Sequence, residues 1–198
     1  MSKCKVVERV LSVGAWKLLL VMALIAIAVL NVPPTSHAEM ETSITPEQAV
    51  EKYLAWAPQG YDVPNPYEAV IVGFGARATP AVLAALAKDE SGFVWILGQI
   101  GDPRAFDVLW DLFEKASNAT MRMRVGFSLG SSLDESNIQR LMLKLEKLDP
   151  SVSLALLRQI TRQDFEGNMQ EWRAWLSNAK NLDSVVRYCK QRSIPILG

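Results

Sequence analysis

Residues 95–113 constrain the fold of this chain most, because a helix stop and a helix start lie four residues apart there. Gly98 and Gly101 permit the backbone of a tight turn, Asp102 suits a helix cap, and Pro103 suits a first helical position. The apolar residues that follow recur at helical spacing and predict one apolar stripe, made of Ala105, Val108, Leu109, Leu112 and Phe113. A helix with such a stripe needs a neighbour to cover it.

The same pattern recurs along the chain. Residues 129–134 fall into register with residues 97–102, and residues 75–82 form a version with a shorter turn. A degenerate copy follows at residues 160–165 with a helix around Trp172. One helical hairpin cannot bury its own apolar face, so repeated hairpins predict a stack.

Residues 97–109, LGQIGDPRAFDVL, resemble the turn of a HEAT repeat, specifically the bacterial phycocyanin-lyase-type HEAT-like repeat. Residues 160–165 with Trp172 resemble the closing unit of some bacterial exported HEAT-repeat proteins, except that Arg162 replaces a turn glycine. The resemblance covers residues 66–180. It implies a short α-solenoid of stacked helical hairpins, an ARM-type superhelix. Because no segment shows sustained two-residue alternation, the residues themselves also predict an all-α fold.

Residues 1–38 are predicted to be a signal peptide. Four basic residues precede an apolar run at residues 18–30, and the small residues Ser36 and Ala38 predict cleavage after Ala38. The run of 13 residues is shorter than the roughly 20 that a membrane-spanning helix needs. We therefore expect a periplasmic or secreted protein with no membrane insertion after cleavage. The alternative is an uncleaved N-terminal anchor.

The composition after residue 38 excludes several classes of function. Of 21 basic and 21 acidic residues the leader holds four and one, which leaves 17 against 20 and no signature of nucleic-acid binding. The sequence's one histidine, His37, lies in the leader, which argues against histidine-based catalysis and most zinc or iron sites. We expect no cofactor and no metal. The remaining cysteine, Cys189, either pairs with another chain or packs beneath the C-terminal segment.

The remaining chain divides into three predicted parts. Residues 39–64 hold an N-terminal capping helix and a loop, and Thr45, Pro46 and Gln48 form a capping box at the helix start. The apolar side of this helix consists of Ala49, Tyr53 and Trp56.

Residues 65–180 hold about four HEAT-like helical pairs. In the third pair Ser132 and Glu135 predict another capping box, and in the fourth Asp149 and Pro150 predict a helix start. Residues 181–198 form a C-terminal tail with a short helix.

The resemblance places the second helix of each pair on a concave layer, where such stacks bind protein or peptide partners. On the second pair, several residues lie outside the core stripe and are the candidate partner-binding set, namely Arg104, Phe106, Asp107, Trp110 and Asp111. Trp110 is expected to project from this layer without filling the core. The alternative is that Phe106 and Trp110 pack against neighbouring units.

Other candidates are weaker. Asp107, Asp111 and Glu114 fit no calcium loop, and a solvated helix face explains them. In the HEAT pattern an arginine often bonds an aspartate of the neighbouring turn, a structural role that the resemblance implies for Arg122 and Arg124. Trp172 and Trp175 share the helical spacing of core residues.

The sequence favours an exported HEAT-repeat scaffold that binds another protein and has no catalytic activity of its own. One alternative is a lyase-like protein or accessory subunit of an enzyme complex that uses carboxylates only, and another is a purely structural module.

Overall fold

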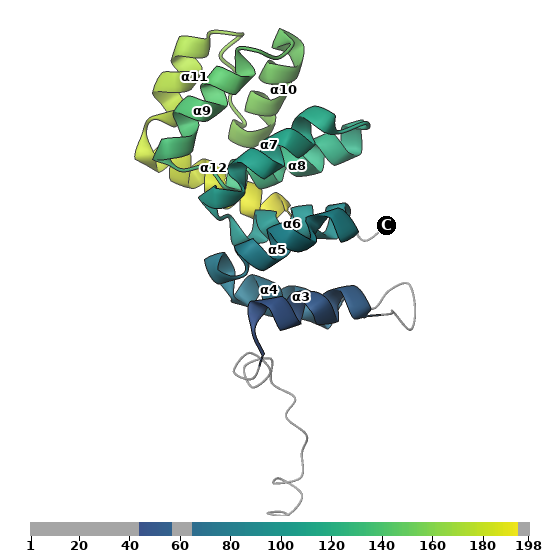
Figure 1. The fold of residues 1–198 in the computed structure, drawn as a ribbon. Helices are drawn as coiled ribbons and strands as arrows, with labels where there is room; N and C mark the ends of the chain where they lie inside the picture. Colours follow the sequence, from purple (N-terminus) through teal and green to yellow (C-terminus); the bar gives the residue numbers. More distant parts are fainter. Residues whose placement is uncertain (1–43, 57–64, 194–198) are drawn as a thin grey trace, which may run out of the picture. The chain divides into compact units, whose positions relative to one another are not determined.

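The computed structural model describes residues 44–56 and 65–193 (Figure 1). Every regular element in these ranges is helical, which confirms the all-α prediction for them. The predicted signal peptide with its cleavage site at Ala38, and most of the predicted first loop, lie outside the described residues. The elements are α3 Pro46–Ala55, α4 Pro66–Gly73, η1 Gly75–Arg77, α5 Thr79–Ala85, η2 Leu86–Lys88, α6 Glu90–Ile100, η3 Pro103–Ala105, α7 Phe106–Lys115, α8 Ala119–Ser131, α9 Glu135–Leu145, α10 Pro150–Thr161, α11 Met169–Leu176 and α12 Ala179–Arg192.

Short polar side chains start most of these helices by accepting hydrogen bonds from free backbone N–H groups. The capping box of α3 is confirmed, since Thr45 and Gln48 each accept the other's backbone N–H. Asp149 caps α10 ahead of its proline, as expected. A capping box expected from Ser132 is wrong: the Ser132 hydroxyl donates to the end of α8, and Asp134 caps α9 instead.

Successive helices contact one another in two rows (Figure 1). The first row is α4, α6, α8 and α10, each of which packs against the next. Ser128 on α8 donates to the Val94 carbonyl on α6 at 2.8 Å, and Gln159 on α10 donates to the Met123 carbonyl on α8 at 2.7 Å. In the second row α3 contacts α5, α5 contacts the turn η3 that leads into α7, and α9 contacts α11. The helices of both rows, together with α12 Ala179–Arg192, contribute the buried apolar side chains of the core.

Gly98 and Gly101 have different roles. Gly101 ends α6 in the left-handed region with φ 65°, where a side chain is strained, as the turn motif predicted. Gly98 was expected to serve the same turn, but it lies inside α6 and is buried. A β-carbon there would lie 2.6 Å from the Ser128 hydroxyl and would overlap the Ser193 side chain. Gly98 therefore allows other elements to approach α6 closely.

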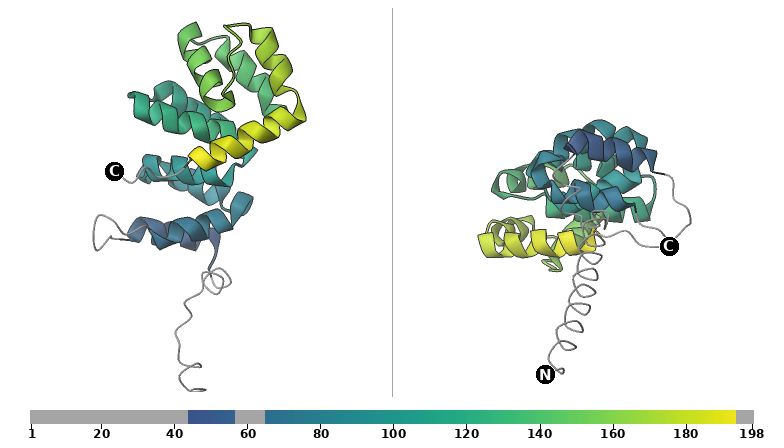
Figure 2. Two further views of the ribbon diagram at one scale, coloured as in Figure 1. Left: turned by 180° about the vertical axis from the view of Figure 1, so that it is seen from behind. Right: turned by 90° about the horizontal axis from the view of Figure 1, so that it is seen from below.

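The C-terminal segment forms a longer helix than expected. We predicted a short helix within a tail at residues 181–198, but α12 has 14 residues and begins at Ala179. It crosses the first row and contacts α6, α8 and α10 (Figure 2). Gln99 on α6 donates to the Lys190 carbonyl at 2.7 Å, which attaches the end of α12 to a helix much earlier in the chain.

Cys189 lies where α12 packs against this row, next to Gly130 of α8 and Ile160 of α10. Its side chain is 0% exposed, and its Sγ lies 3.7 Å from the Ile160 carbonyl oxygen. A β-carbon at Gly130 would overlap this sulfur, so the glycine makes room for α12. Burial raises the pKa of the Cys189 thiol to about 12. Of the two expectations for this cysteine, packing beneath the C-terminal segment is confirmed.

Candidate functional site

The two aromatic residues of the predicted partner-binding set lie in the core. Phe106 is 0% and Trp110 1% exposed. Residues of α9 cover both rings, because the Arg140 guanidinium lies 5.2 Å from the Phe106 ring centroid and the Lys144 ammonium 5.4 Å from that of Trp110. The expectation that Trp110 projects without filling the core is therefore wrong, and the alternative, that Phe106 and Trp110 pack against neighbouring elements, is confirmed. α7 buries two faces, and the second face lies outside the stripe that the helical spacing predicted.

The charged residues of that set are split between structural contacts and solvent. Arg104 pairs with Asp102 and donates to the Ala76 carbonyl, which links it to the preceding turn. Burial alone raises the pKa of Asp102, but the hydrogen bonds from Arg104 outweigh this effect and hold the pKa below its usual value. Asp107 pairs with Arg140 of α9, while Asp111 is exposed. Binding by these residues stays a prediction.

The other candidates also have structural positions. Arg122 and Arg124 contact the Ala116 carbonyl at 2.9 Å and the Ser91 hydroxyl at 3.0 Å, so neither bonds the aspartate that the resemblance implied. Trp172 is fully buried against Phe165, which confirms it as core, whereas Trp175 is half-buried. In the part of the chain that the structure describes, no group of three or more His, Cys, Asp or Glu side chains could hold a metal ion.

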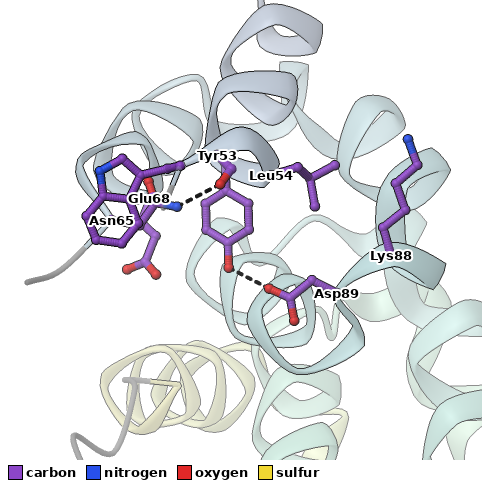
Figure 3. A pocket seen from close by; sticks show the side chains of 7 residues that line it. Tyr53, Leu54, Asn65, Glu68, Lys88 and Asp89 are labelled. Carbon is purple, nitrogen blue, oxygen red and sulfur yellow. Dashed lines mark hydrogen bonds between the residues drawn. The ribbon is translucent and has the colours of Figure 1, made fainter. Parts of the chain in front are cut away.

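A pocket of about 430 Å³ lies where α3, α4 and the start of α6 meet (Figure 3). It collects side chains from the end of α3, from the cap and first turn of α4, and from the segment just before α6. The lining residues are Tyr53, Leu54, Trp56, Asn65, Glu68, Lys88 and Asp89.

Hydrogen bonds hold three of these side chains in place (Figure 3). The Tyr53 hydroxyl donates to Asp89 Oδ2 at 2.8 Å, while Asp89 Oδ1 accepts the Gly92 N–H at 3.1 Å as the cap of α6. Asn65 caps α4 and donates through Nδ2 to the Tyr53 carbonyl at 2.9 Å. Tyr53, Asn65 and Asp89 therefore form a fixed polar wall.

Glu68 is not part of that wall. Within residues 44–56 and 65–193 its carboxylate has neither a hydrogen-bond donor nor a cation within 4 Å of its oxygens. Partial burial and the charge of Asp89 raise its pKa. Burial and the bond to Asp89 raise the pKa of Tyr53 as well, which keeps the phenol neutral. In Figure 3 Glu68 and Asp89 flank the Tyr53 ring, and the Lys88 ammonium points away from both. A bound cation would relieve this charge imbalance.

A second, shallower pocket of about 290 Å³ lies between α8 and α10, near the end of α7. Its lining includes Met123, which is 39% exposed, together with Val152 and Leu156. It offers apolar contact but no arrangement of reactive groups.

Sequence reasoning did not find the first pocket. Tyr53 was assigned to the apolar side of a capping helix, and neither Glu68 nor Asp89 was singled out. The residues that meet there are 36 positions apart at Tyr53 and Asp89, and no local motif links them. The available signal was Asp89 alone, a cap-type residue directly before a helix.

Comparison with known proteins gives no family for this chain. In the described residues, no helix is both long and apolar enough to cross a membrane. No family model, curated protein or solved structure gives a significant match.

Proposed function

We propose that this protein is an exported HEAT-like α-solenoid that binds another protein and has no catalytic activity of its own. The two rows of contacting helices support the solenoid arrangement, and the charged, apolar and small-residue pattern of residues 1–38 supports export. Sequencing the N-terminus of the exported protein tests the second point. We expect Glu39 as the first residue, whereas an intact Met1 in a membrane fraction would indicate an anchor.

The observation that carries the binding function is the half-buried Glu68 carboxylate, which has no cation beside it in the described residues. A guanidinium or ammonium group from a partner would pair with Glu68 and also benefit from the charge of Asp89. Tyr53, Leu54 and Trp56 line the same pocket and offer apolar surface to the methylene groups of an arginine or lysine. The partner is therefore a protein with an exposed basic side chain.

Calorimetry with two small probes tests this site. N-acetyl-arginine amide carries the guanidinium, and N-acetyl-citrulline amide has nearly the same shape without the charge. We expect binding of the first probe only, and a loss of about tenfold in Glu68→Gln, which is about 1.4 kcal/mol. Glu90→Gln is the matched control, because Glu90 is exposed and does not line the pocket. Equal binding of both probes, or equal losses in both variants, would contradict the proposal.

The raised pKa of Glu68 gives a pH signature. As the pH falls toward that pKa the carboxylate takes up a proton, so affinity for the arginine probe should begin to fall above the ordinary value of 4.5. The natural partner requires crosslinking in the native envelope followed by mass spectrometry. A partner captured equally by wild type and Glu68→Gln would bind elsewhere.

A further inference from the structure

Glu68 stands at a position where a glutamate often helps to start a helix. Asn65 is the cap of α4, so Glu68 is the third residue of that helix. At the same position in α3, Gln48 accepts the Thr45 N–H at 2.9 Å and completes a capping box. In the described part of the chain Glu68 accepts no bond from Asn65, whose side chain donates to the Tyr53 carbonyl instead. The Glu68 carboxylate is therefore not used to cap its own helix.

Both oxygens of this carboxylate are available to a ligand. In the described residues neither accepts a hydrogen bond or forms an ion pair, and the half-buried side chain lines the first pocket, which we call the Glu68 pocket. Residues 57–64, which join the two described ranges, include no lysine, arginine or histidine. Asp89 differs, because one of its oxygens accepts the Tyr53 hydroxyl and the other accepts the Gly92 N–H. A ligand thus meets two unshared oxygens on Glu68, while Asp89 contributes mainly its charge.

The two basic side chains bind a carboxylate of this kind differently. A guanidinium group is planar and directs parallel N–H donors at both oxygens, while an ammonium group is a compact, strongly hydrated point charge. We propose that the Glu68 pocket selects arginine over lysine in the partner protein. This inference rests on the proposed binding function, and it goes further by naming the side chain that the pocket takes.

The other residues of the Glu68 pocket suit the same group. Trp56 lines the pocket and is half-buried, and guanidinium groups stack on aromatic faces. A guanidinium group is also less strongly hydrated than an ammonium group, so it loses less when it enters a half-buried site. The Lys88 ammonium points away from Glu68 and Asp89, so it does not compete with an incoming cation for either carboxylate (Figure 3).

Calorimetry of the full chain with three probes of equal charge tests the preference. The probes are N-acetyl-arginine amide, N-acetyl-lysine amide, and the arginine probe methylated on both terminal nitrogens. We expect the arginine probe to bind about tenfold more tightly than the lysine probe, which corresponds to about 1.4 kcal/mol. The methylated probe keeps the positive charge but loses the paired donors, so its affinity should fall to about that of the lysine probe.

Substitution of Glu68 tests whether this residue causes the preference. Glu68→Gln removes the charge and replaces one acceptor oxygen by a donor. Affinity should therefore fall about tenfold for the arginine probe but only about threefold for the lysine probe, which reduces the advantage of arginine to about threefold. Glu90→Gln is the matched control, because Glu90 is exposed and does not line the pocket. It should leave the advantage of arginine at about tenfold.

The outcomes separate this inference from the binding function. If wild type binds neither the arginine nor the lysine probe, both are overturned. Equal binding of these two probes, with losses in Glu68→Gln, would leave the binding function standing and overturn only the preference. Equal affinity for arginine and its methylated form, or an advantage that persists unchanged in Glu68→Gln, would also overturn it. The comparison of probes in wild type needs no substitution, so it decides the preference even if Glu68→Gln does not fold.

Discussion

The turn after α6 and the turn after α10 make the same backbone structure from different residues. Gly101 and Arg162 both adopt the left-handed conformation, with φ of 65° and 59°. Each donates its N–H to the carbonyl four residues earlier, at 2.8 and 2.9 Å. Both helices thus end with the same hydrogen bond and the same left-handed residue, and the residue type changes the steric strain at that position. Glycine is preferred in such a turn but is not required there.

The two turns also use their aspartates differently. The Asp102 side chain is buried, 4% exposed, and forms an ion pair with Arg104, a later residue of the same turn. Asp164 forms an ion pair with Arg158, an earlier residue on α10, and both of these side chains are exposed. The first turn is therefore part of the core, and the second lies at the surface. This contrast leads to four predictions.

The largest loss of stability is expected at a feature that the two regions share, a fully buried tryptophan in the helix after each turn. Trp110→Ala and Trp172→Ala each remove a fully buried indole and should each lower the free energy of unfolding by about 3–5 kcal/mol in denaturant titrations. Leu143→Ala, at a side chain 54% exposed, is the control and should change stability by less than about 0.5 kcal/mol. A small loss at Trp110 would return this residue to the candidate binding surface.

A substitution at the first turn should be strongly unfavourable. Gly101→Ala places a β-carbon 2.8 Å from the Ser131 carbonyl oxygen in a left-handed residue, and also against the Lys190 side chain. We expect a loss of about 2 kcal/mol in unfolding free energy. The double variant Gly101→Ala/Lys190→Ala should recover only part of the loss, because the backbone conflict remains. Full recovery would mean that the left-handed conformation itself carries little strain.

The aspartates should differ in a pH-dependent way. Because the pKa of Asp102 is lowered in the fold, its contribution is fully present above the usual pKa of 3.8 and is lost as the pH falls through the lower folded value. Asp102→Asn should therefore cost about 1 kcal/mol of stability at neutral pH, with the difference from wild type shrinking in acid. The pKa of Asp164 is also lowered, by hydrogen bonds from Arg158 and from the Glu166 N–H. These bonds lie at an exposed site where solvent screens them, so Asp164→Asn should cost much less stability than Asp102→Asn. Equal effects at the two positions would remove the distinction between a core turn and a surface turn.

The smallest change in unfolding free energy is expected at Arg162, where the substitution should stabilise the fold rather than destabilise it. Arg162→Gly should raise the free energy of unfolding by less than about 1 kcal/mol, since relief of left-handed strain exceeds the lost contact between the Arg162 guanidinium and the Tyr188 ring, whose centroid lies 5.5 Å away. The measurement uses the same denaturant series as Gly101→Ala. If both variants lose stability, the two turns differ in more than strain.

Sequence reasoning located most of the helices and several of their starts because these depend on nearby residues. Asp149 and Thr45 each cap a helix by accepting a backbone N–H group from a residue close by in the sequence. Such caps are therefore visible as local sequence patterns. It offered the burial of Trp110 against neighbouring units only as an alternative, because a single stripe identifies one buried face and the second face depends on contacts with a later helix. It also missed the Glu68 pocket and the length of α12, which depend on contacts between distant segments. The candidate site was thus less predictable than the fold.

The crossing of α12 has a consequence for the order in which the chain folds. In stacks where each unit touches only its neighbours, structure propagates along the chain as it becomes available. Here the bond from Gln99 to the Lys190 carbonyl joins residues separated by 91 positions, and contacts of such long range raise the contact order, which correlates with slower folding. α6 and α8 reach their full burial only when α12, which carries Cys189, has packed against them. A chain that still lacks its last helix would therefore leave the surfaces of α6 and α8 that α12 covers open to solvent.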